Sequence, residues 1–295
     1  MITYVVSDLF QSPARVLVNA VNVVGVMGKG VAEQFKRCYP DMFEQYRTLC
    51  DAGQFTVGQL WLYRTPHKWV MNFPTKSHWR DPSRVEYVEA GLRKFAETYA
   101  EQGITSISFP LLGCGAGGLD WPTQVRPLME RYLSPLPVNT YIHLYEPDNP
   151  FAVKVTDPDA ICAWLNGEPE TPAFTQVWDD VTRLILQRGS FTTLDRQLPF
   201  QVSFDASERR IAITPPSGDP LLISQSLLSE TWHYARAAGF VLGLNLPGGV
   251  DARYVLALLA ELPYFRPVLW SETDSPDQRQ IGLQYVTPVS EVAAP

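Results

Sequence analysis

Short apolar runs alternate with segments of helical periodicity over roughly the first 150 residues. The apolar or β-branched runs, each bounded by turn residues, predict strands at 2–6, 16–19, 57–63, 69–73, 104–112 and 138–145. Helices are predicted at 28–50 with a break near Pro40, at 121–132, and across 85–99, where Val85, Val88, Leu92, Phe95 and Tyr99 share one face. This alternation predicts an α/β fold in which helices flank a parallel or mixed sheet.

The pattern changes after Tyr145, where prolines and acidic residues gather at 146–150 and again at 167–172. We therefore predict two domains, residues 1–155 and residues 156–295. Beyond the boundary, an amphipathic helix is expected at 174–185 and a hairpin at 200–204 and 210–214. Further helices are expected at 227–238 and 251–262, and a strand at 280–286. These elements predict a second, smaller α+β domain.

Charge separates the two regions of this 295-residue chain. Residues 1–150 contain 14 basic and 14 acidic side chains, whereas residues 151–295 contain 10 and 17, so the net charge of -7 lies entirely in the second region. An acidic surface argues against stable DNA binding there, because binding requires cations that displace counterions from phosphate.

The cysteines and the amino-terminal residues bear on the compartment. Successive cysteines lie 12, 64 and 48 positions apart, which is neither the spacing of zinc ligands nor a disulfide framework. No apolar run approaches a membrane span, and the first residues lack the features of a signal peptide. We expect a cytoplasmic protein with reduced thiols, no membrane association, no cofactor and no metal site.

Two glycine-rich segments carry the first chemical signal. The first glycine loop, residues 25–30, follows a strand that ends in Asn19-Ala-Val-Asn22 and precedes a helix expected near Val31. The second glycine loop, residues 113–118, follows another strand and also precedes a helix. Glycines permit close backbone approach, and a helix start presents unpaired N–H groups to an anion. The first loop is either a phosphate-binding loop or a tight turn, and the second is either a phosphate-binding loop or a flexible connector. The presence of two such loops favours a diphosphate between strand ends.

In these segments the sequence resembles a macrodomain, the fold that binds ADP-ribose. The motifs that carry the resemblance are Ser7-Asp8-Leu9, Asn19-Ala-Val-Asn22, Met27-Gly-Lys-Gly-Val-Ala32 and the second glycine loop. The resemblance implies that Asp8 accepts a hydrogen bond from the adenine amino group, that Asn22 orients the distal ribose, and that both loops wrap the phosphates. The alternative for Asp8 is an ordinary turn at the strand end, and for Asn22 it is capping of the backbone. The resemblance assigns ligand contacts to Asp8, Leu9, Asn19, Asn22, Gly28, Lys29, Gly30, Val31, Gly113, Cys114, Gly115, Ala116, Gly117, Gly118 and Tyr145.

Within this family the chain is similar to the branch of terminal ADP-ribose glycohydrolases and DarG antitoxins, which remove ADP-ribose from DNA. The segment responsible is 71–80, Met-Asn-Phe-Pro-Thr-Lys-Ser-His-Trp-Arg. The resemblance implies a catalytic role for Lys76, which is otherwise a solvated loop cation. It implies the same for Asp120, for which the alternative is a helix N-cap before Trp121-Pro122.

The function predicted from this resemblance is a glycohydrolase that releases ADP-ribose from modified single-stranded DNA. In DarG antitoxins the region after the macrodomain neutralises the toxin DarT, a DNA ADP-ribosyltransferase. We expect residues 156–295 to bind such a toxin, with solubility as the alternative reason for their acidity. The alternatives for the first domain are a non-catalytic ADP-ribose reader and a hydrolase of modified protein or of a small ADP-ribose metabolite. The segment 77–80 is expected either to contact the DNA strand or to form a surface turn.

Overall fold

The computed structural model describes residues 2–146, 148–149, 151, 157–167, 172–243, 246 and 251–286. The chain divides into two compact units. Unit 1 comprises Met1–Glu168 and Ser271–Gln278, and unit 2 comprises Pro169–Trp270 and Arg279–Pro295. The predicted boundary between residues 155 and 156 lies outside the described residues. Helix α5 (Pro158–Asn166), which follows that boundary, belongs to unit 1.

Unit 1 contains a mixed sheet of six strands. They are β1 (Ile2–Val6), β2 (Val16–Val21), β3 (Trp61–Tyr63), β4 (Trp69–Pro74), β5 (Ser106–Phe109) and β6 (Asn139–His143). Their order in the sheet is β1-β6-β5-β2-β4-β3. All neighbours are parallel except β3 and β4, which confirms the predicted α/β class. Strand β3 begins later than predicted, after a turn in which Gly58 has φ +82°.

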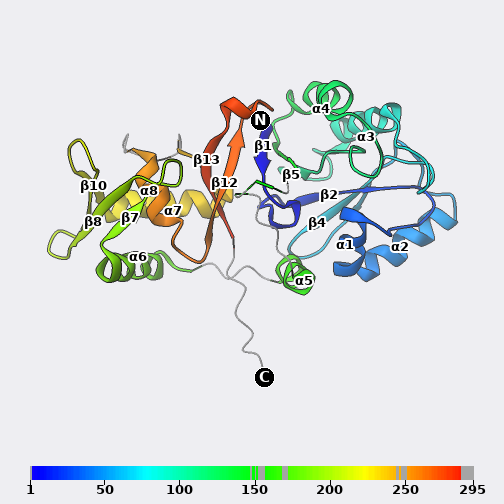
Figure 1. The fold of residues 1–295 in the computed structure, drawn as a ribbon. Coiled ribbons are helices and arrows are strands. Elements are labelled where there is room, and N and C mark those ends of the chain that lie inside the picture. Colours follow the sequence, from blue (N-terminus) through cyan, green and yellow to red (C-terminus); the bar gives the residue numbers. More distant parts are fainter. Residues whose placement is uncertain are drawn as a thin grey trace. The chain divides into compact units, whose positions relative to one another are not determined.

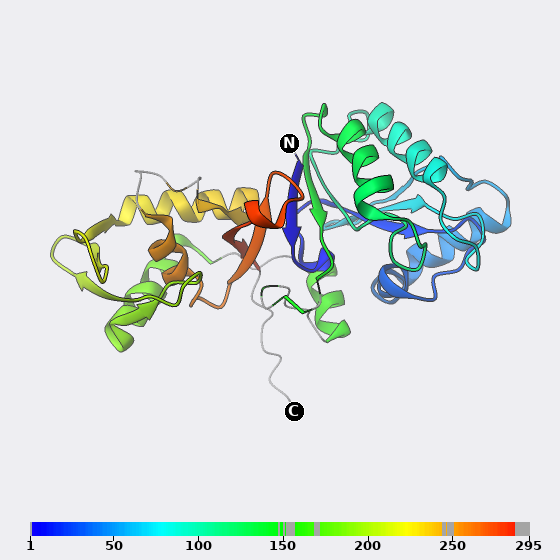
Figure 2. The same cartoon turned by 45° about the horizontal axis from the view of Figure 1, so that its top comes forward.

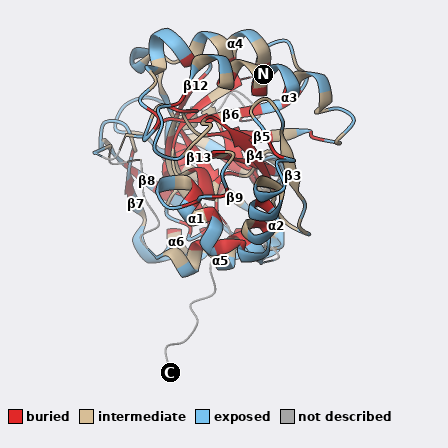
Figure 3. Ribbon diagram, turned by 90° about the vertical axis from the view of Figure 1, so that its right-hand side faces the viewer, coloured by how far each residue is buried: buried red, intermediate tan, exposed pale blue. Residues whose placement is uncertain are grey.

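Helices cover both faces of this sheet (Figures 1 and 2). They are α1 (Gly30–Cys38), α2 (Pro40–Asp51) and α5 on one face, and α3 (Val85–Thr98) and α4 (Arg126–Leu133) on the other. Leu17 and Val21 of β2 share a buried cluster with Phe35 of α1. On the opposite face, Phe73 of β4 lies so close to Gly91 of α3 that an added Cβ would be 2.2 Å from its ring. The central strands β2 and β4 are therefore buried on both sides, and much of the exposed surface lies on the helices and loops (Figure 3).

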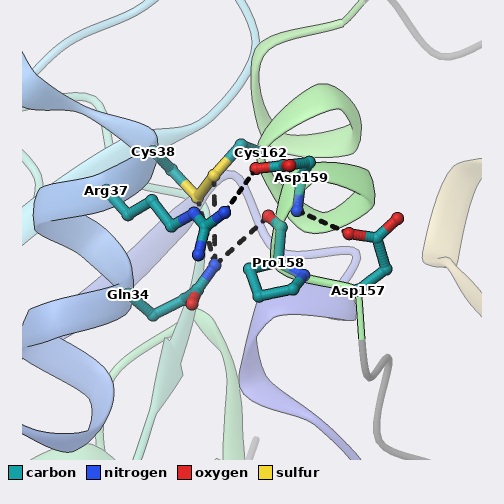
Figure 4. Close-up of polar contacts among 7 residues, drawn as sticks. All are labelled: Gln34, Arg37, Cys38, Asp157, Pro158, Asp159 and Cys162. Carbon is teal, nitrogen blue, oxygen red and sulfur yellow. Dashed lines mark hydrogen bonds and ion pairs between the residues drawn. A yellow bond between two sulfur atoms is a disulfide. The ribbon is translucent and has the colours of Figure 1, made fainter.

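A disulfide fastens α5 to α1, so the prediction of reduced thiols is wrong for two of the four cysteines. Cys38 and Cys162 are bonded across 124 residues of sequence, whereas Cys50 and Cys114 are free. The pairing could not be predicted from spacing because it depends on packing between two helices that are distant in the chain. Polar contacts surround the bond, among them an ion pair of 2.7 Å between Arg37 and Asp159 (Figure 4).

Unit 2 contains two antiparallel sheets and three main helices in its described part. The helices are α6 (Phe174–Arg188), α7 (Gln225–Ala238) and α8 (Ala252–Leu259). One sheet has the order β10-β9-β8-β7, formed by Leu221–Ser224, Arg210–Thr214, Pro199–Asp205 and Ser190–Thr192. The other pairs β13 (Gln280–Tyr285) with β11 (Phe240–Val241) and with β12 (Phe265–Ser271). The predicted hairpin, helices and last strand of this α+β region are confirmed.

None of the helices in the described part of the chain combines the length and the apolar character that crossing a bilayer requires.

Candidate functional site

The segments singled out in the sequence meet at one edge of the unit 1 sheet. Asp8 follows β1, the first glycine loop follows β2, Lys76 follows β4, and the second glycine loop follows β5. These four strands run parallel through their neighbours in the sheet. Their carboxyl ends therefore lie at the same edge, which is the usual place for a ligand in an open α/β sheet.

Asn22 shapes the segment that leads into α1. Its Oδ1 accepts hydrogen bonds from the backbone N–H groups of Val24 (3.0 Å) and Val26 (3.3 Å), and its Nδ2 donates to the Val26 carbonyl (2.6 Å). The Tyr46 hydroxyl adds a bond of 2.8 Å to the Asn22 carbonyl. Asn22, predicted to orient a ribose, thus braces the start of the first glycine loop.

Helix α1 starts at Gly30, between the start of the predicted helical segment at residue 28 and the helix start expected near Val31, and Gly30 itself has φ +60°. Its N-cap is Lys29, which makes no side-chain capping bond within the described part of the chain. The first N–H groups of α1 are therefore without a side-chain cap, which suits a helix start that receives an anion. At this helix start, Gly28 precedes the N-cap Lys29 and Val31 follows Gly30.

The second glycine loop folds back on itself and rests on Ser83. The N–H of Ser83 donates to the Gly117 carbonyl (2.9 Å), and Leu119 N–H donates to the Gly113 carbonyl (3.1 Å). A Cβ at Gly117 would lie 2.2 Å from Ser83 Oγ and 2.3 Å from the Gly113 oxygen. Only glycine fits at position 117, whereas Gly115, Ala116 and Gly118 are exposed.

Lys76 reaches across to the second glycine loop. Its Nζ donates a hydrogen bond of 2.7 Å to the Ala116 carbonyl, 40 residues further along the chain. The side chain is partly buried. This contact brings the predicted catalytic lysine and the predicted phosphate loop together at the sheet edge.

Asp120 has the geometry of a helix N-cap. It precedes a π-helical turn, Trp121–Val125, and its Oδ1 accepts hydrogen bonds from the Thr123 N–H (3.0 Å) and the Thr123 hydroxyl. Oδ2 forms no hydrogen bond within the described residues. No hydrogen bond or ion pair joins Asp120 to Lys76 in that part of the chain. Burial, the larger cause, and the Asp120 charge, the smaller one, raise the pKa of the nearby Cys114 thiol to about 11. This thiol therefore stays protonated at neutral pH.

Asp8 and Tyr145 lie at the other side of the site. Asp8 caps a short 3₁₀ helix, Leu9–Gln11, through an Oδ1 bond of 3.0 Å from the Phe10 N–H, and Leu9 is buried. Tyr145 follows β6 and is 66% exposed. Asp8 follows β1 and Tyr145 follows β6, and these two strands are neighbours in the sheet.

Comparison with known proteins agrees with this arrangement. The Macro domain family matches residues 18–127. The DNA ADP-ribosyl glycohydrolase of Thermus aquaticus is 45% identical over 157 residues, which cover 52% of this chain and 43% of that protein. Residues 18–127 therefore belong to a macrodomain. The predicted resemblance and the macrodomain type of the sheet are thereby confirmed.

Two further relatives extend the comparison. A DNA ADP-ribosyl transferase-DNA ADP-ribosyl glycohydrolase fusion protein of Thermosipho africanus is 36% identical over 162 residues, 48% of this chain and 42% of that protein. The solved macrodomain of Mycobacterium tuberculosis DarG is 43% identical, covers 50% of this chain and 99% of its own, and has a TM-score of 0.48. The match therefore spans less than half the length of the curated relatives.

Two asparagines, Asn19 and Asn72, are buried side by side in the macrodomain sheet, and Asn72 was not among the predicted site residues. Asn19 and Asn72 are register partners on β2 and β4, and Asn19 Nδ2 donates to Asn72 Oδ1 (3.0 Å). Asn19 Nδ2 also lies 3.7 Å from Met27 Sδ. Asn19, predicted as a ligand contact, is fully buried, and its side chain contacts Met27, which lies within the first glycine loop. An amide within the apolar run Met71-Asn72-Phe73 is the signal that could have revealed Asn72.

A cavity lined by residues of the macrodomain lies away from these loops. It has a volume of about 430 Å³, and its lining includes Cys38, Tyr63, Arg64 and Asn166. Arg64 precedes β4, so the cavity lies toward the amino end of that strand, whereas Lys76 follows its carboxyl end. In the described residues, no three His, Cys, Asp or Glu side chains gather as metal ligands.

Proposed function

We propose that this protein is a glycohydrolase that removes ADP-ribose from modified single-stranded DNA. The observation that carries the proposal is the contact between Lys76 Nζ and the Ala116 carbonyl, which joins a lysine to the second glycine loop. The names of the relatives at 45% and 36% identity support the same reaction. A module that only binds ADP-ribose would need the loops but not a lysine beside them.

In the proposed complex the diphosphate lies between the start of α1 and the second glycine loop, where backbone N–H groups stabilise its charge. Asp8 accepts a hydrogen bond from the adenine amino group, and Asn22 orients the distal ribose from the loop that it braces. These contacts fix the anomeric carbon of the distal ribose near Lys76.

The reaction breaks the bond between that carbon and a nitrogen of the base. In the covalent route the neutral Lys76 amine bonds to the anomeric carbon of the ring-opened sugar, and the base leaves with the bonding electrons and a proton. Water then adds to the resulting imine, which releases ADP-ribose and regenerates the amine. In the non-covalent route Lys76 acts as an electrophile or an acid, and water attacks directly.

Asp120 is proposed as the group that protonates the departing base or activates water. Its capping bonds engage Oδ1, which leaves Oδ2 for this role. The alternative, that Asp120 acts only as a helix cap, is consistent with the same bonds, so a substitution that preserves the cap is needed to separate the two.

The second proposal concerns the region beyond the macrodomain. We propose that unit 2 binds a DarT-like DNA ADP-ribosyltransferase and that the whole protein acts as its antitoxin. The fusion relative, which carries both activities in its name, and the acidic excess of residues 151–295 support this pairing. An acidic surface complements the cationic groove that a DNA-modifying enzyme needs.

A time course on an ADP-ribosylated single-stranded oligonucleotide tests the hydrolase. We expect Lys76→Ala to lower the rate of ADP-ribose release by about 100-fold or more, in the range of a lost proton-transfer group, while calorimetry shows retained ADP-ribose binding. Lys94→Ala, an exposed lysine on α3, is the matched control. Undiminished release by Lys76→Ala would refute the assignment of Lys76. Trapping with borohydride separates the covalent route from the non-covalent one.

Lys76→Ala also tests the antitoxin role in the full-length chain. Because this variant no longer removes the modification, any fall in transferase activity on addition of the variant reflects direct inhibition. Transferase activity that is unchanged at saturating concentrations of the variant would remove the toxin-binding proposal and leave the hydrolase proposal intact.

A further inference from the structure

The strand order of the macrodomain sets the order of the proposed subsites. Along the sheet, Asp8 follows β1, Tyr145 follows β6, the second glycine loop follows β5, the first follows β2, and Lys76 follows β4. Four strand spacings of about 4.8 Å separate the two ends by roughly 19 Å. In the proposed complex, ADP-ribose lies along this order of strands, with its adenine at Asp8 and its distal ribose at Lys76. The base attached to that ribose must therefore continue past Lys76.

The large apolar side chains that are exposed in the described part of unit 1 gather at the same edge. The large hydrophobic residues that are exposed in the described part of unit 1 are Val24, Val26, Trp79 and Tyr145. All four lie on segments that follow the carboxyl ends of β2, β4 or β6. Exposed apolar side chains collected at a binding edge indicate contact with a ligand. Among them, Trp79 is the one in the segment that follows β4, beyond Lys76.

Trp79 lies in a braced turn and is accompanied by a cation. Its side chain is 45% exposed, and the Arg80 guanidinium lies 4.5 Å from the ring centroid. The His78 ring is 5.6 Å away at an interplanar angle of 30°. The turn is held by a backbone bond from Asp81 N–H to the His78 carbonyl (3.1 Å) and by a bond from Arg80 N–H to the side-chain Nδ1 of His78 (3.3 Å).

We propose that His78, Trp79 and Arg80 form a stacking shelf for the substrate strand. Trp79 stacks on a nucleobase next to the scissile bond, and Arg80 pairs with a backbone phosphate. Base–aromatic stacking and arginine contacts are the sequence-tolerant means by which proteins bind single strands. The inference rests on the proposed function, because it assigns to the same site the part of the substrate that lies beyond ADP-ribose.

The test compares kcat/KM on an ADP-ribosylated single-stranded oligonucleotide with Kd for free ADP-ribose, which contains no nucleobase beyond Lys76. We expect Trp79→Ala to lower kcat/KM by about 5- to 100-fold, the range of one lost base stack, while Kd for ADP-ribose stays within twofold. Trp79→Tyr retains a ring and should recover most of the loss. Tyr234→Ala, an exposed aromatic residue of unit 2, is the control.

The arginine is tested by salt dependence. For Arg80→Gln we expect the slope of log kcat/KM against log salt concentration to become shallower by about 0.7, the value for one phosphate contact on a single strand. Arg131→Gln on α4, whose side chain is 72% exposed, should leave the slope unchanged.

The outcomes separate the shelf from the hydrolase. Wild-type protein that releases no ADP-ribose from DNA would overturn the proposed function, and the shelf with it. Active wild type with an unchanged Trp79→Ala variant would overturn the shelf alone. An equal loss of ADP-ribose affinity in Trp79→Ala would also overturn it, because the role of Trp79 would then lie inside the nucleotide-sugar site.

Discussion

Acid should destabilise the macrodomain through one buried histidine. His143 on β6 is buried, and its Nδ1 lies 3.1 Å from Ser7 Oγ while its Nε2 lies 3.3 Å from Ser108 Oγ. Burial lowers the pKa of His143 from 6.5 to about 4, against a smaller opposing effect of the Ser7 backbone. The side chain is therefore neutral in the folded protein throughout the range in which a free histidine becomes charged.

The sign and size of the effect follow from linkage. As the pH falls below 6.5 the unfolded chain binds a proton at His143, and the folded chain does so only near pH 4. Stability is therefore unaffected by this group above pH 6.5 and is lost progressively between pH 6.5 and 4. At about 1.4 kcal/mol per pH unit, the total loss is roughly 3 kcal/mol.

The assay is urea unfolding of the full-length chain between pH 7.5 and 4.5. Unfolding is monitored by hydrogen exchange of peptides that cover β6. This readout reports unit 1 alone. His143→Asn keeps a hydrogen-bonding side chain but cannot become charged, so its free energy of unfolding should depend less on pH over this range. His233→Asn, which removes an exposed histidine, is the control. Equal pH dependence in the wild type and in His143→Asn would refute the reasoning.

Three further substitutions test other parts of the structure. Gly117→Ala must displace the second glycine loop from Ser83 and should weaken ADP-ribose binding by at least tenfold in calorimetry, whereas Gly53→Ala, whose added methyl meets no atom within 4 Å, should not. Asp120→Asn retains an effective N-cap and should lower kcat by about 100-fold with unchanged thermal stability; an unchanged kcat would leave Asp120 as a cap alone. Cys38→Ser should destabilise unit 1 by about 2–4 kcal/mol in urea unfolding under oxidising conditions, a difference that should vanish when the wild type is reduced.

Local patterns were sufficient to predict most elements of the macrodomain. The break between α1 and α2 at Pro40 and the start of α1 beside the first glycine loop follow from proline geometry and from glycine content. Strand β12 was missed because Pro267, which lacks a backbone donor, interrupts an otherwise apolar run. Helix α5 was missed because it is short and lies among prolines, and its stability depends on contacts with α1 that sequence periodicity does not report.

The arrangement of the site depends on strand order, which differs from chain order. Asp8 and Tyr145 are 137 positions apart in the chain, yet they follow β1 and β6, which are neighbours in the sheet. Lys76 and Ala116 are 40 positions apart and follow β4 and β5, which are separated in the sheet by β2, so their contact requires the Lys76 side chain to extend past the end of β2. The motifs alone identify the groups at the sheet edge, but they do not reveal the order in which these groups lie along that edge. The order β1-β6-β5-β2-β4 gives the site a direction, from Asp8 to Lys76, and that direction is the ground for proposing that Trp79, in the segment after β4, contacts what the sugar carries.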